Sequence, residues 1–141
     1  MHYEQDFYGW LLESAQLLRE KKFSQLDIAN IAEELEAIAR SDKRQLINRL
    51  AVLLAHLLKW QFQSHIRSKS WQRTIKEQRK RIKLLLKDSP SLKYEIEQKI
   101  ASAYEIAILS AANETLLDED TFPETCEYSL DEILNQEFYP D

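Results

Sequence analysis

Apolar residues recur every three to four positions along most of the chain, which is the spacing of one face of an α-helix. The first such stripe predicts a helix that begins after an N-cap at Asp6 and ends near Lys21. No segment alternates apolar and polar residues as a half-buried strand does, so the pattern predicts an all-α protein. The residues of this first stripe are Phe7, Trp10, Leu11, Ser14 and Leu18.

A second apolar stripe begins after Ser24 and Asp27, a variant of the capping box, and keeps the same phase on both sides of the polar stretch RSDKRQ. Because no Gly or Pro interrupts that stretch, we predict one long helix. Beyond Arg49 the residues are apolar on nearly all sides, which predicts the central buried element of the fold. The stripe consists of Ile28, Ile31, Leu35, Ile38, Ala39, Leu46, Leu50, Leu53, Leu57 and Trp60.

Three more helices are predicted from cap signals. Ser70 caps a third helix, Ser89-Pro90 ends it and begins a fourth that reaches about Glu114, and Ser129 with Glu132 forms a capping box for a short last helix. Short connections favour a bundle of about four main antiparallel helices plus the short C-terminal one. We expect a single domain over residues 1–141, a bundle over 1–113 and an acidic tail over 114–141 that packs on it.

Composition excludes several classes of protein. A chain of 141 residues with one Gly and three Pro lacks the glycine loops that cradle nucleotides, so no cofactor is expected. The single Cys126 cannot form an internal disulfide, and the N-terminus lacks a secretory pattern. The apolar stretch from Leu50 to Leu58 is far shorter than the roughly 20 residues of a membrane span. We therefore expect a cytoplasmic protein with no membrane partner.

Charge is strongly segregated along the chain. Residues 40–88 carry fourteen basic and three acidic groups, whereas residues 114–141 carry ten acidic groups and no basic one. On a helical wheel, six cations of the third helix share one arc, which could neutralise phosphates of a nucleic acid. The acidic tail and the absence of a nucleic-acid motif favour a solvated or internally matched face instead. This basic stripe is Lys69, Arg73, Lys76, Lys80, Lys83 and Lys87.

Polar residues border the apolar line of the long helix. His56 with Glu33, Glu34 or Glu36 could supply a general base, and Arg49 an anion anchor. The same residues could equally form a polar seam that holds two helices in register, with a carboxylate for Arg49. The structural alternative is favoured because the sequence offers no nucleophile. No metal site is predicted, because the Glu-x-x-His spacing of helical di-metal sites is absent.

Aromatic residues cluster near both ends of the chain. Tyr8, Trp10, Phe138 and Tyr139 could be core anchors or a patch that faces a partner.

The motifs YEQDFYGW, IAEELEAI, LLAHLLKWQFQ, SWQRTIKEQRKRI, LLKDSPSL and FPETCEYSLDEILNQEFYP follow one another along nearly the whole chain. In this order they resemble the bacterial, notably cyanobacterial, family labelled domain of unknown function 29. The resemblance implies an all-helical fold and a bacterial cytoplasmic origin, but no activity. It singles out the positions Asp6, Trp10, Glu33, Glu34, His56, Lys59, Trp60, Trp71, Gln78, Arg79, Ser89, Pro90 and Pro123.

If the second and third helices pack together, several of these positions form one cluster. We therefore expect a non-enzymatic protein-interaction or adaptor module that binds a protein partner or itself. Nucleic-acid binding through the basic stripe is the first alternative, and an enzyme that uses His56 with a Glu is the second. The candidate binding cluster is His56, Trp60, Trp71, Gln78 and Arg79, with Glu33, Glu34 and Arg49 as support.

Overall fold

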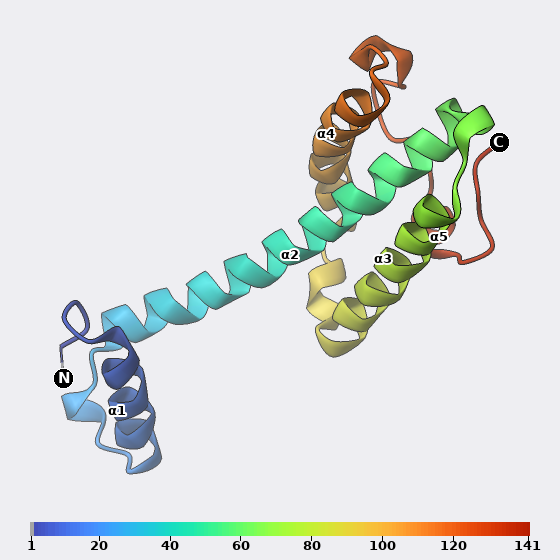
Figure 1. Ribbon diagram of the computed structural model, residues 1–141. Helices are drawn as coiled ribbons and strands as arrows, with labels where there is room; N and C mark the ends of the chain where they lie inside the picture. The colour runs from blue at the N-terminus through green and yellow to red at the C-terminus, as the bar shows by residue number, and fades with distance from the viewer. Residues whose placement is uncertain (1) are drawn as a thin grey trace. The chain divides into compact units, whose positions relative to one another are not determined.

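The computed structural model describes residues 2–141 and is all-α, as the periodicity predicted (Figure 1). About 76% of the chain is helical, and no strand occurs in the described residues. Short 3₁₀ turns join the α-helices at Phe23–Gln25, Ser64–Ile66, Pro90–Lys93 and Glu119–Thr121. The α-helices are α1 (Phe7–Arg19), α2 (Ile28–Phe62), α3 (Lys69–Asp88), α4 (Ile96–Thr115) and α5 (Leu130–Leu134).

Several predicted boundaries are confirmed. The Asp6 carboxylate caps α1 by accepting a hydrogen bond from the backbone N–H of Gly9 at 3.0 Å. α2 is one unbroken helix of 35 residues across RSDKRQ. The short helix α5 begins with the predicted capping box, in which Ser129 and Glu132 each accept a backbone hydrogen bond from the other.

Three predicted helix starts are wrong. Ser24 lies in a 3₁₀ turn, and the Asp27 carboxylate accepts from Asn30 N at 3.3 Å at the start of α2. α3 starts two residues early because Ser68, not Ser70, accepts from Trp71 N at 3.2 Å. Pro90 begins only a 3₁₀ turn, and α4 starts at Ile96 because Glu95 adopts a left-handed conformation (φ 51°) that separates the two.

The chain divides into two compact units, Met1–Asp42 and Lys43–Asp141. Unit 1 contains α1 and the first part of α2. Its centre is Trp10, whose ring meets that of Tyr3 edge-on at a centroid distance of 4.7 Å. The Tyr3 hydroxyl in turn donates to Glu34 Oε1 at 2.5 Å, which ties the N-terminal segment to α2.

Unit 2 holds the main hydrophobic core. The second part of α2 lies beside both α3 and α4 (Figure 1), and side chains of all three helices are fully enclosed there. The tail adds Phe122 and Ile133, so the segment after α4 is part of the core. None of the helices in the described residues has the length and apolar character needed to cross a membrane. The buried residues of α2 in this core are Leu46, Leu50, Ala51, Leu53, Leu54, Ala55, Leu57 and Leu58.

Candidate functional site

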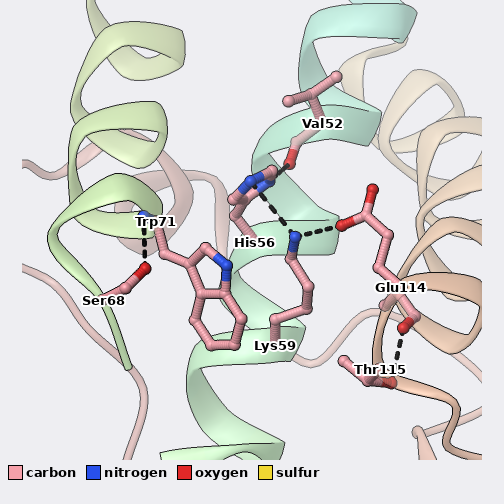
Figure 2. A network of polar contacts seen from close by, with 8 residues as sticks. Val52, His56, Lys59, Ser68, Trp71, Glu114 and Thr115 are labelled. Carbon is pink, nitrogen blue, oxygen red and sulfur yellow. Dashed lines mark hydrogen bonds and ion pairs between the residues drawn. The ribbon is translucent and has the colours of Figure 1, made fainter. Parts of the chain in front are cut away.

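Lys59 lies at the centre of a polar network between three helices of unit 2 (Figure 2). Its ammonium forms an ion pair with Glu114 of α4 and lies 3.4 Å from Nε2 of His56, one turn earlier on α2. The same ammonium lies 5.2 Å from the ring centroid of Trp71 on α3, within range of a cation–π contact. With only 4% of Lys59 exposed, this charge is held by the two helices that flank α2.

The hydrogen bonds define the protonation state of His56. Its Nδ1 lies 2.8 Å from the carbonyl oxygen of Val52, and since a carbonyl can only accept, Nδ1 carries the proton. Nε2 of the neutral ring is then free to accept from Lys59. Burial is the largest effect and lowers the pKa of His56; the hydrogen bond with Val52 opposes it, the nearby Lys59 ammonium lowers the pKa further, and Glu114 has a smaller raising effect. The arrangement stabilises a neutral imidazole.

Arg79 has a different role from the one its place in the predicted cluster suggested. The side chain is fully buried, with 0% exposed. Its Nε donates to the carbonyl of Ile133 at 2.7 Å, and Nη2 donates to those of Glu132 at 3.1 Å and Phe138 at 2.8 Å. Nη1 is buried without a partner in the described structure. Arg79 thus fastens α5 and the residues after it to α3.

Contacts between aromatic and cationic side chains add to this attachment. Tyr139 lies against Trp60 with ring centroids 4.8 Å apart, and the Arg79 guanidinium is 5.5 Å from the Tyr139 centroid. The Arg67 guanidinium also lies 4.9 Å from the centroid of the Trp60 ring and donates to Asp141 O at 2.9 Å. Trp60 therefore packs against Tyr139 of the tail.

The remaining predicted residues join other partners. Arg49 Nη1 donates to the side-chain oxygen of Gln78 at 3.4 Å, so an amide takes the place of the expected carboxylate. Glu33 pairs with Arg40 at 3.1 Å, and Glu34 accepts from Tyr3, both within unit 1. The carboxylate next to Lys59 and His56 is Glu114. In the described residues, the contacts of the five cluster residues fall into three groups, around Lys59, Arg79 and Arg49.

The basic stripe stays exposed along α3. The tail packs on α3 through Arg79 and through Gln136, whose amide donates to the backbone carbonyl of Lys76 at 3.0 Å. Within residues 2–141, no acid of the tail forms an ion pair with a cation of the stripe. An internal charge match between tail and stripe is therefore not how the cations are satisfied.

Unit 1 presents an apolar strip on α2. Ile28 is 66% exposed, Leu35 63% and Ile38 61%. On the helical wheel, these residues and the exposed Ala32 and Ala39 fall within an arc of roughly 120°. We call these five residues, Ile28, Ala32, Leu35, Ile38 and Ala39, the open stripe.

α1 is also only partly covered. Trp10 is the only buried hydrophobic side chain among the described residues of unit 1, so of the aromatic residues near the chain ends Trp10 is a core anchor, whereas Tyr8 is exposed. Further large apolar side chains of unit 1 that reach solvent are Phe7, Leu11, Leu12, Leu18 and Phe23.

Sequence reasoning gave no role to two features. Lys59, which the family motifs single out, directly follows the apolar run from Leu50 to Leu58, but its partner Glu114 is 55 residues away on another helix. The open stripe has a clear sequence signal, yet periodicity reports only that a face is apolar and not whether anything covers it. No group of three or more potential metal ligands from His, Cys, Asp and Glu comes together in the described residues.

Comparison with known proteins assigns the chain to a family of unknown activity. No curated protein and no solved structure matches it. A family model with the description "Domain of unknown function DUF29" matches residues 2–139, nearly the whole chain, in agreement with the motif order. The chain therefore belongs to the DUF29 family.

Proposed function

We propose that the protein is a helical protein-interaction module, and that a partner docks on the open stripe of α2. The observation that carries this proposal is the exposure of Ile28, Leu35 and Ile38, each above 60%, along about three turns of one helix. Contiguous apolar surface of this kind typically marks an interaction site in soluble proteins.

The small core of unit 1 supports the same proposal. About 40 residues that bury one large hydrophobic side chain, Trp10, are near the lower limit at which a chain segment folds without a metal, a disulfide or a partner. A docked partner would add the apolar contacts that unit 1 lacks. Unit 2 needs no such help, because its core is formed by α2, α3, α4 and the tail.

A photo-crosslinking experiment in cells of the native host tests the proposal. A benzophenone amino acid replaces Leu35 in one variant and Leu109 in another; Leu109 is 58% exposed on α4 of unit 2 and serves as the matched control. We expect a discrete crosslinked protein from position 35 and none from position 109. Absence of a product at position 35, or the same products at both positions, contradicts the proposal.

A second candidate function, nucleic-acid binding, is supported by the exposed cations of the basic stripe, none of which forms an ion pair with an acid among residues 2–141. Arg73 and Lys76 border a hollow of about 410 Å³ that Tyr139 also lines, and cations beside an aromatic ring suit a single strand. Affinity should fall linearly in log K against log salt concentration, and Lys76→Glu with Lys80→Glu should abolish it. No DNA or RNA binding at low salt would end this candidate.

A further inference from the structure

The shape of the open stripe and the charges around it indicate what kind of partner binds there. Resting on the function proposed above, we infer that the occupant is an amphipathic α-helix of another protein, with an apolar side bordered by Lys and Arg.

The shape of the surface selects a helix. The open stripe runs along about three turns of α2, and its larger residues are spaced at three and seven positions, the spacing with which one helix packs its side chains against another. Within α2 the backbone N–H and C=O groups are bonded to one another, so the stripe cannot extend a strand. An occupant must therefore satisfy its own backbone and contribute only an apolar side.

The charges around the stripe select a basic helix. Residues 2–42 carry nine acidic and four basic groups. Three of the acids border the stripe, since Asp42 lies one turn beyond Ile38, Glu36 lies one turn from both Ala32 and Ala39, and Asp27 precedes Ile28. Arg40, the one cation in residues 28–42, is paired with Glu33 at 3.1 Å, and Lys43, one turn beyond Ala39, is the one cation that borders the stripe on α2. Opposite charges at such a rim favour encounter and register, whereas an acidic helix would meet like charge.

The same charges disfavour a second copy of this chain. Two open stripes packed face to face would bring their acidic borders together. The basic helix of a second copy, α3, supplies cations but only one exposed large apolar side chain, Leu84, because Ile75 and Ile82 are fully buried in its own core. A helix that fits the stripe needs both an exposed apolar side and cations along its border. The described surface of this protein offers no helix with both features.

Two synthetic peptides test the inference with the full-length protein. Both have 18 residues and place Leu at the same amphipathic positions, and one carries Lys and the other Glu at every remaining position. We expect the Lys peptide to bind, more weakly at 300 mM than at 50 mM salt, and the Glu peptide not to bind. Fluorescence anisotropy gives the dissociation constants, and circular dichroism checks the fold of each variant.

Charge-neutral variants separate the stripe from general attraction to the acidic tail. Leu35→Asn with Ile38→Asn keeps the net charge and should weaken Lys-peptide binding at least about 30-fold, because two apolar contacts are lost. The matched control, Leu84→Asn with Leu109→Asn, removes two side chains of 58% exposure from unit 2 and should leave binding unchanged.

A third double variant tests the acids that border the stripe. Glu36→Gln with Asp42→Asn should weaken binding of the Lys peptide about 3- to 10-fold.

Other outcomes overturn the inference in distinguishable ways. If the Glu peptide binds as tightly as the Lys peptide and the Leu35/Ile38 variant loses both, docking stands but the basic chemistry is wrong. If sedimentation shows a dimer that the Leu35/Ile38 variant breaks, a second copy is the occupant. If neither peptide binds, or if the Leu35/Ile38 and Leu84/Leu109 variants behave alike, the inference fails; it fails together with the proposed function when position 35 also yields no crosslink.

Discussion

The same apolar stripe runs along both parts of α2, but it is buried in one part and exposed to solvent in the other. From Leu46 to Leu57 the stripe is enclosed by α3, α4 and the tail, and Leu53 is completely buried. From Ile28 to Ile38 the stripe is mostly open to solvent. Helical periodicity is equally clear in both parts. The pattern therefore predicts that a face of the helix is apolar, but not whether another segment buries that face.

The difference extends to the two units as a whole. Unit 2 gathers seventeen buried hydrophobic residues in one cluster, whereas Trp10 is the only one in the described part of unit 1. Since burial of apolar surface is the main favourable contribution to folding, stability should be concentrated in unit 2. The predictions below test this contrast from the largest expected effect to the smallest.

Equivalent truncations in the two parts of α2 should differ most. Leu53→Ala leaves a cavity in the core and should reduce the free energy of unfolding by about 2–5 kcal/mol. Leu35→Ala removes an exposed side chain and should change it by less than about 0.5 kcal/mol. Urea unfolding of the isolated protein measures both, and similar losses for the two variants would mean that the open stripe is covered in solution.

The attachment of the tail to α3 should depend on Arg79. Arg79→Met leaves the carbonyls of Ile133, Glu132 and Phe138 without their donor, which should cost about 2–4 kcal/mol and expose the tail to proteases.

Arg81→Met is the matched control for that substitution. Arg81 is exposed two residues further along α3, where it pairs with Glu77 at 3.4 Å, and its loss should cost no more than about 0.5 kcal/mol. Equal protease resistance of the Arg79 variant and the native protein would show that the tail is held by its apolar contacts alone.

Stability of unit 2 should also depend on pH through His56. Its pKa is lowered in the folded protein, so the unfolded chain binds the proton more readily. The contribution of the neutral ring is complete above the ordinary histidine pKa of about 6.5 and is lost as the pH falls below it, when a second cation would face Lys59. Urea unfolding between pH 7.5 and 5.5 should show this loss in the native protein.

His56→Gln should flatten that pH dependence, whereas His65→Gln, at an exposed position, should retain it. A dependence unaltered by the His56 substitution would assign the effect to other groups.

Much of the local structure could be predicted, and the tertiary contacts could not. Asp6 and Ser129 were identifiable as caps because a cap acts on residues within one turn. The partners of Arg79 are 53 to 59 residues away and are backbone carbonyls, which have no sequence signature. Ser68 and Ser70 are both acceptable caps by residue type, so the choice between them depended on where the preceding turn ends.

The sequence by itself determined the all-α class, the unbroken long helix and the separation of basic from acidic segments, because these depend on periodicity, local caps and residue counts. Only the tertiary structure decided which apolar stripes are covered, which ion partners Lys59 finds, and that the tail is fastened by Arg79 while the basic stripe stays free. Burial and pairing are properties of surfaces brought together from distant parts of the chain. For the open stripe, the described residues of unit 1 supply no such cover.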